Sequence, residues 1–185
     1  MANLDLAKCW TTGTPPPAQP DAADVSLHGA LVAFQMHVCR FLREWLPLAP
    51  VVAQGKPGAI TFADKKTIAS DVEASLRSIG ISLVVGLDTG TRAAAALHAI
   101  AFDPFTFVIN IAESPVTNRG EKGTGITASR AAELVMLCLS GVRLGNGVSA
   151  VKSFSVGGEE GSLQTAEVTF QTSYTITPPA SLLAD

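Results

Sequence analysis

The chain has 185 residues, of which 47% are hydrophobic and only 16% are charged, and its formal net charge is −3. An average soluble domain is about 25% charged, so a monomer of this composition would expose much apolar surface unless another subunit covered it. The small net charge and the absence of any run of like charge argue against a groove built for duplex DNA. The length is that of a single domain.

The three cysteines and the N-terminus indicate where the protein is made. Cys9, Cys39 and Cys138 are odd in number, far apart and outside any CxxC spacing, so we expect free thiols and a reducing compartment. Asp5 and Lys8 interrupt the N-terminus, which therefore lacks the apolar region of a secretory signal. No apolar run approaches the ~20 residues that a membrane-spanning helix needs, so we expect a soluble protein.

The first 20 residues are rich in proline, threonine and glycine, and this composition predicts a flexible, solvated N-terminal arm. The arm is either disordered or a docking strand for a neighbour. Asp21 is a plausible helix N-cap, and a long amphipathic helix is expected to run from it to Pro47. Its apolar stripe is Leu27, Leu31, Phe34, Val38, Phe41 and Trp45. Core packing is favoured for this stripe over a special role in binding a partner.

The next elements are a short strand around Ile60 and a second helix. The residues 70–73 fit a capping box, and Gly80 is a suitable stop. Alternation over residues 81–87 then predicts a strand that ends in the turn signal at residues 88–90. Residues 93–102 are open between helix and strand before a second turn signal at residues 103–104.

Residues 105–112 alternate clearly, and the opposite face of this predicted strand, which carries Thr106 and Asn110, is semi-polar. A loop of about a dozen residues follows from Ser114, and loops of this length commonly have a function. A third helix is expected from about Thr127 to Gly141, and it is apolar enough to be deeply buried.

The end of the chain predicts a β-hairpin formed by residues 148–156 and 163–177. Together these elements predict an α+β fold: a mostly antiparallel sheet with helices packed on one face, a long N-terminal helix and an extended N-terminal arm. We expect one domain over residues 21–177, after the flexible arm of residues 1–20 and before a flexible tail of residues 178–185.

No motif for chemistry emerges, and we predict neither catalytic, cofactor-binding nor metal-binding residues. His28, His37 and Cys39 would point in different directions on one helix and cannot share an ion there. A ligand set that uses Cys9 or His98 remains open, but ordinary core or surface histidines are favoured.

Sequence signatures of catalysis and nucleotide binding are also missing. No Gly-x-Ser-x-Gly elbow is present. The glycine-rich residues 120–125 lack the Gly-Lys-Ser/Thr order of a phosphate-binding loop. Asp88, Asp103 and Glu113 lie near predicted strand ends, where turn formation is favoured over acid–base catalysis. The sequence therefore predicts a protein that is not an enzyme.

The order of elements resembles the tail terminator and neck proteins of long-tailed bacteriophages. The resemblance covers roughly residues 68–177. It rests on the helix and strand of residues 72–87, on the strand and Asn118-Arg119 loop of residues 105–119, on the helix near residues 127–139 and on the strand of residues 166–176. The long N-terminal helix and the preceding prolines depart from the compact pattern of that family.

The resemblance implies a structural protein of the virion, located in the tail or neck and assembled in the host bacterial cytoplasm. Its subunits would form a homo-oligomer, a hexameric ring that caps the tail tube and joins it to the head connector. Its partners would be the tail tube protein and the connector or neck proteins, with no membrane contact, no specific nucleic-acid binding and at most passive contact with DNA in the lumen.

The resemblance also suggests an interface loop. Its candidate residues are Thr117, Asn118, Arg119, Glu121, Lys122 and Thr124. Deletion of residues 117–124 is expected to leave the fold intact and weaken assembly. The alternatives are another head-to-tail connector or tail-completion component and, from a different class, a small ligand-binding domain or enzyme.

Overall fold

The fold is centred on one five-stranded sheet. The computed structural model describes residues 9–52, 59–96, 99–157 and 163–177. The strand order is β1-β2-β3-β7-β6, and every neighbouring pair is antiparallel except β1 and β2. The strands are β1 (Ile60–Phe62), β2 (Ile81–Ala96), β3 (Ala99–Glu113), β6 (Ala150–Val156) and β7 (Gln164–Ile176), and a separate small sheet pairs β4 (Arg143–Leu144) with β5 (Gly147–Val148).

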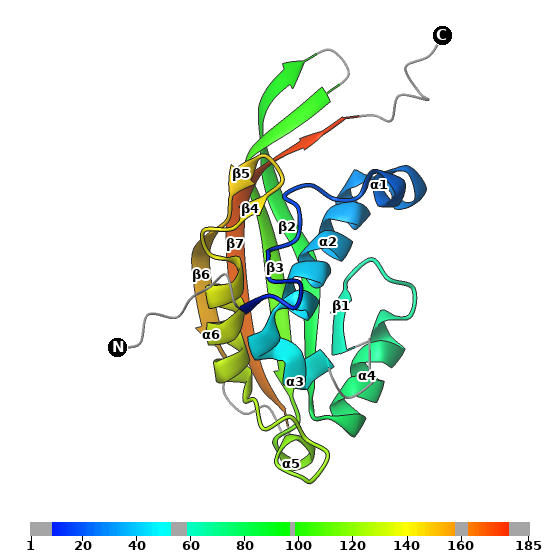
Figure 1. The fold of residues 1–185 in the computed structure, drawn as a ribbon, viewed down its shortest axis with the longest axis vertical. Helices are drawn as coiled ribbons and strands as arrows, with labels where there is room; N and C mark the ends of the chain where they lie inside the picture. Colours follow the sequence, from blue (N-terminus) through cyan, green and yellow to red (C-terminus); the bar gives the residue numbers. More distant parts are fainter. Residues whose placement is uncertain (1–8, 53–58, 97–98, 158–162, 178–185) are drawn as a thin grey trace.

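Two helices cover one face of this sheet, as Figure 1 shows. The helices are α1 (Ala22–His28), α2 (Ala30–Glu44), the 3-10 helix η2 (Leu46–Leu48), α3 (Ala49–Val52), α4 (Ile68–Ser78), α5 (Pro115–Asn118) and α6 (Ala128–Leu139). The main cover is α2 and α6, whereas α4 lies at the β1 edge with its Val72 beside Ser82 and Val84 of the other face. The predicted α+β class with a mostly antiparallel sheet is confirmed.

The core lies between α2, α6 and the inward side chains of the strands. In β3 and β7, alternate residues are buried, and Phe107 pairs with Phe170 as stacked rings 5.3 Å apart. The ring of Phe34 packs against Phe107 at 5.4 Å and against Tyr174 at 4.8 Å. Each fully buried phenylalanine contributes about 2 kcal/mol to folding, so these rings hold α2 on the sheet.

The predicted long N-terminal helix is two helices. Gly29 has φ 83° and ψ 156°, a conformation that favours glycine and interrupts the helix. Its N–H caps α1 by donating to the Val25 carbonyl. Asp21 is the predicted N-cap and accepts from the Ala23 N–H at 2.8 Å. Beyond the break, the Tyr174 hydroxyl donates to the Ala30 carbonyl at 3.0 Å and fastens the start of α2 to β7.

In the described part of the predicted arm, Trp10 and Pro16 are buried, whereas most of residues 11–20 are exposed. The Trp10 ring lies 5.6 Å from Phe41 and 5.8 Å from Trp45, and only 8% of Trp10 is exposed. The Thr11 N–H donates to the Glu44 carbonyl at 2.9 Å. The arm is therefore anchored to α2 at Trp10. Residues 1–8 and 178–185 lie outside the described residues, and the domain boundaries stay a prediction.

The β2 and β3 strands form one long hairpin that extends beyond the helical layer (Figure 1). The turn predicted at residues 88–90 is wrong, because β2 continues through shifts in pairing register near Gly90 and Arg92. The turn predicted at residues 103–104 is also wrong, because Asp103 and Pro104 lie in a register shift within β3. The open segment 93–102 is strand as far as it is described. Bulges absorb turn-type residues without ending a strand.

The remaining predictions concern element ends. The third helix is confirmed: the Thr127 side chain caps α6 by accepting from the Arg130 N–H, and Gly141 follows with φ 77°. It is less buried than predicted, because Leu137 is exposed. The capping box at residues 70–73 is wrong, because α4 begins at Ile68. The closing hairpin is confirmed as β6 paired with β7, and its predicted turn lies partly outside the described residues.

Candidate assembly surfaces

The predicted interface loop is organised around a buried carboxylate and a buried amide. The Glu113 side chain, at the end of β3, accepts from the Asn118 amide at 2.8 Å and from the Ala128 N–H of α6 at 2.7 Å. Asn118 also donates to the Ile126 carbonyl and accepts from Thr124 Oγ1 and the Gly125 N–H. This network joins the end of β3, the loop and the start of α6.

Two glycines allow the loop to close on Asn118. A Cβ atom at Gly80 or at Gly123 would overlap the backbone of Asn118. The Ser114 N–H donates to the Gly80 carbonyl at 2.8 Å, so the loop is packed on the junction between α4 and β2. Gly80 and Gly123 are therefore needed for close backbone approach to Asn118.

The six predicted interface residues separate into inward and outward groups. Asn118 is buried, and the Thr117 and Thr124 hydroxyls take part in hydrogen bonds within the loop. Arg119, Glu121 and Lys122 are exposed and form no ion pair with any residue that the structure describes. Their role at an interface stays a prediction. The Asn118 side chain stabilises the loop, because all its hydrogen bonds are to groups of the loop and its two ends.

A first apolar surface lies on α1 and the start of α2, which we call the α1 surface. Leu27 is 76% exposed and Leu31 is 40% exposed, although both belong to the stripe for which core packing was favoured. The later members of that stripe, such as Phe34 and Phe41, are buried. The break at Gly29 carries α1 away from the sheet, so the apolar residues before it have no cover among the described residues.

A second apolar surface lies on β6, which we call the β6 surface. Phe154 is 62% exposed and Val156 is 51% exposed, and they pair with Val168 and Ala166 on the helix-covered side of the sheet. β6 is the edge strand, and α6 leaves these two side chains exposed. In Figure 1, β6 forms the left edge of the sheet and α1 lies at the upper right, so the two surfaces are on opposite sides.

Backbone groups add to the β6 surface. Among the described residues, β6 pairs only with β7, so its outer N–H and C=O groups face away from the sheet. Such an edge is a template for further pairing, and a lysine on the edge limits unspecific pairing. Lys152 is the one charged residue of β6. Specific contact is therefore expected to use the Phe154 and Val156 side chains.

A cavity of about 370 Å³ lies on the opposite face of the sheet. Its floor comes from neighbouring register positions: Val84, Asn110 and Glu167 lie side by side, as do Ser82 and Thr165 across β3. Apart from Glu167 its lining carries no charge. The semi-polar character predicted for the face with Asn110 is confirmed by this lining.

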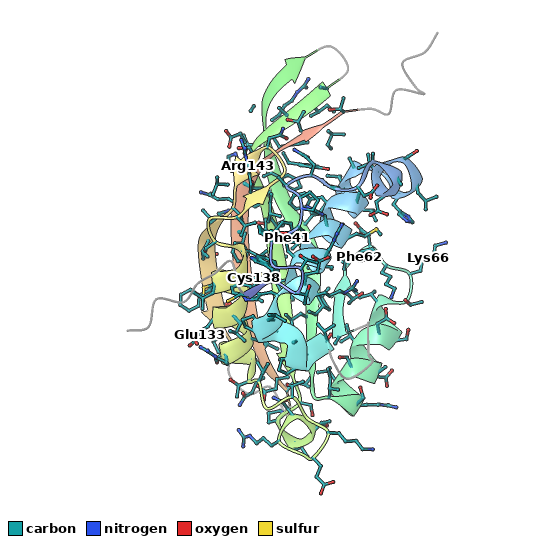
Figure 2. The ribbon with its side chains drawn as sticks, in the orientation of Figure 1. Phe41, Phe62, Lys66, Glu133, Cys138 and Arg143 are labelled. Carbon is teal, nitrogen blue, oxygen red and sulfur yellow. The ribbon has the colours of Figure 1, made fainter. Side chains whose placement is uncertain are left out.

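Two of the three cysteines, Cys39 and Cys138, are buried in the core. Burial raises the pKa of the Cys39 thiol to about 12 and that of Cys138 well above its usual value, so neither is a thiolate at neutral pH. Figure 2 places Cys138 close to Phe41, whose carbonyl accepts from its thiol at 3.8 Å. None of the three cysteines is in a disulfide.

The His37 side chain also has a structural role. Burial lowers the pKa of His37, and the Pro17 carbonyl accepts from its Nε2 at 2.8 Å. The break at Gly29 separates His28 from the helix of His37 and Cys39, so the single-helix geometry assumed for metal binding does not apply. The described ranges contain no group of three His, Cys, Asp or Glu placed to hold an ion. His98 lies outside them.

No described helix is long and apolar enough to cross a membrane.

The signal that the sequence offered for both apolar surfaces was incomplete. Leu27 and Leu31 were identified as an apolar stripe, but Gly29 inside the stripe was not recognised as a break. Phe154 and Val156 lie on one face of β6 with Ser155 between them, and this alternation gave the strand without showing that it is an edge. The order of strands in the sheet shows that β6 is an edge strand.

Some solved structures are similar to this chain. No protein-family model matches the chain, and no curated protein matches it. Among solved structures, a chain of the virion of a native gene transfer agent particle is similar at 19% identity, with a TM-score of 0.45, over 78% of this chain and 94% of that chain.

Two further similar structures come from Akkermansia muciniphila. One, of a protein without its transmembrane region, has 12% identity and a TM-score of 0.29 over 97% of this chain and 99% of that one. The other, a crystal structure, has 14% identity and a TM-score of 0.32 over 96% and 90% of the two chains. At TM-scores below 0.5 these likenesses carry no argument about function, which rests on the surfaces described above.

Proposed function

We propose that the chain is a structural subunit of a phage-type virion that assembles with copies of itself into a closed ring. One observation carries this proposal: the α1 surface and the β6 surface expose large apolar side chains on opposite sides of the subunit. Exposed apolar side chains are stabilised when a partner removes them from water, by about 25 cal/mol for each Å² that is buried.

The positions of the two surfaces favour a ring over a symmetric dimer. A twofold dimer uses the same patch on both subunits, whereas contact between two different patches leaves one of each free for the next subunit. Such head-to-tail contact closes into a ring when the rotation between subunits is suitable. The low charge content of 16% fits a subunit that is covered on two sides.

The position in the particle is proposed from the order of elements. In the structure β3 ends at the acidic Glu113, the loop with Asn118 and Arg119 follows, and α6 and the β6–β7 hairpin close the domain. This is the order on which the resemblance to tail terminator and neck proteins rests. The proposed role is that of a tail terminator, a hexameric ring between the tail tube and the head connector. Another head-to-tail connector remains the second candidate.

The test uses one variant for each surface. Leu27→Ser with Leu31→Ser removes the α1 surface, and Phe154→Ser with Val156→Ser removes the β6 surface. Each variant alone should sediment as a monomer, because every contact would need the surface that it lacks. An equimolar mixture should form a dimer and nothing larger, because only one intact α1 surface can meet one intact β6 surface.

The control is Leu46→Ser, which changes an exposed leucine outside both surfaces and should assemble like the wild type. Rings formed by either double variant alone would contradict the proposal. Binding of the wild-type ring to purified tail tubes or to head connectors then separates the terminator role from the other connector role.

A further inference from the structure

A second cavity, of about 300 Å³, lies between the segment around Trp10 and the end of α6. Its apolar lining includes Trp10, Pro15 and Pro16 of the N-terminal segment, and Leu137 and Val142 from α6 and the residues after it. Leu137 is 53% exposed, so the described residues leave apolar surface open to solvent here. Such surface is stabilised when apolar side chains cover it.

One charged side chain lies at this cavity. Arg143 of β4 lines it together with Cys138, and Figure 2 labels both side chains. Arg143 is exposed and forms no ion pair with any residue that the structure describes. Because the rest of the lining carries no charge and a guanidinium binds a carboxylate well, the cavity suits a segment with apolar side chains and one carboxylate.

The described chain starts beside this cavity. Trp10 lines it and stacks on Trp45, which also lines it. Cys9 is partly buried and packs against the core, so the chain is still in contact with the subunit where the description begins. Leu6 lies four residues before Trp10, and an extended chain spans about 3.3–3.6 Å per residue. Leu6 is therefore within reach of the other lining residues without help from a second subunit.

The sequence of residues 1–8 matches the lining. Leu4 and Leu6 are apolar, and Asp5 stands between them. In an extended chain, residues two apart share a face and the residue between them points the other way. Two leucines can thus face the apolar lining while Asp5 stays at the rim, where Arg143 offers the opposite charge.

We infer that residues 4–6 fold back over this cavity of their own subunit, with Leu4 and Leu6 against Leu137 and Asp5 paired with Arg143. The inference does not depend on the proposed ring. Residues 178–185 also contain leucines and an aspartate, but they are less suitable. They follow β7 after it has passed the β4–β5 turn, whose Asn146 accepts from the Thr175 N–H at 2.8 Å.

A disulfide test locates the segment. In a Cys9→Ser background, Leu6→Cys with Leu137→Cys puts one thiol on the segment and one at the cavity. Mild oxidation should link them within one chain about tenfold faster than it links Leu6→Cys with Leu27→Cys, because docking raises the effective concentration of the first pair. Leu27 is also exposed but lies on α1. Peptide mass mapping of the non-reduced monomer measures both rates, and circular dichroism checks that each variant is folded.

A charge swap tests the ion pair in the same background. Arg143→Asp should slow the link between positions 6 and 137 about threefold, the size expected for an exposed ion pair, and adding Asp5→Arg should restore the rate. Arg92→Asp, at an exposed arginine of the β2–β3 hairpin, is the control and should leave the rate unchanged.

The result that would overturn the inference is an equal rate for the two cysteine pairs. Linking only into covalent oligomers would also overturn it, because the segment would then occupy the cavity of another copy. A double charge variant that stays as slow as Arg143→Asp would overturn the pairing of Asp5. A wild-type chain that is monomeric at every concentration overturns the ring and leaves this inference standing.

Discussion

The segment around Trp10 and the helix start at residues 22–31 of the same N-terminal region behave in opposite ways. The first segment is rich in proline and was expected to be solvated, yet Trp10 is held between Phe41 and Trp45. The second was expected to pack as the start of an amphipathic helix, yet Leu27 and Leu31 are exposed. Composition was misleading in one direction and periodicity in the other.

The difference teaches what an apolar pattern does and does not establish. A periodic stripe shows that one face of a helix prefers to leave water, but what covers that face depends on the path of the chain. The Gly29 break takes α1 away from the sheet, while the Gln19 amide, by donating to the Gly145 carbonyl at 2.9 Å, helps to hold the first segment in place. An uncovered stripe is therefore a candidate contact for another molecule.

The largest effect is expected for Trp10→Ala, which tests whether the first segment belongs to the core. Truncation of a buried tryptophan costs about 3–5 kcal/mol, so the urea midpoint of unfolding should fall strongly. Thr12→Ala, at an exposed neighbour, is the control and should change the free energy of unfolding by less than about 0.5 kcal/mol. A near-wild-type midpoint for Trp10→Ala would mean that the segment is not packed in solution.

The interface loop shows the same contrast between buried and exposed residues. Asn118→Ala leaves the buried Glu113 carboxylate with one donor fewer and should cost about 3 kcal/mol in urea unfolding. Deletion of residues 117–124 removes Asn118 and should be destabilising for the same reason, in contrast to the expectation from the sequence that it leaves the fold intact. The paired variant Arg119→Ser with Lys122→Ser should unfold like the wild type, and equal losses in both variants would contradict this division.

A smaller effect is expected from pH at His37, which joins the first segment to α2. Because burial lowers the folded-state pKa of His37 below the unfolded value of 6.5, the unfolded chain binds the proton more readily. This contribution is complete above about pH 6.5 and is lost as the pH falls below it. The decrease in melting temperature from pH 7.5 to pH 5.5 should be smaller in His37→Gln than in wild type, and unchanged in His28→Gln.

The smallest effect on folding is expected at the α1 surface. Leu27→Ser with Leu31→Ser should change the free energy of unfolding of the dilute monomer by less than about 0.5 kcal/mol, because these side chains are exposed. A loss of more than about 2 kcal/mol would mean that they pack within the same subunit. This measurement completes the comparison with Trp10.

Much of the fold was predictable where local and tertiary preferences agree. The alternation that includes Phe107 and Ile109 gave β3, and Thr127 with Gly141 gave the ends of α6, because these residues both favour the local structure and face the core. The turn signals at Asp88 and Pro104 misled, because long-range pairing with the neighbouring strands kept the chain extended through bulges.

The candidate site was less predictable than the fold. The loop itself was found from its length and glycines, but the inward direction of Asn118 depends on Glu113 and on the start of α6, which only the fold brings together. The exposure of Phe154 depends on β6 being an edge strand, and local pattern does not determine the order of strands.

The native mass of the purified chain tests the account most directly. Native mass spectrometry of the wild type over a range of concentrations should show one discrete closed assembly, with six times the subunit mass of 19.1 kDa as the expected value, in equilibrium with monomer. A chain that stays monomeric at every concentration, also when purified tails are added, would contradict the claim that sister subunits cover the α1 and β6 surfaces.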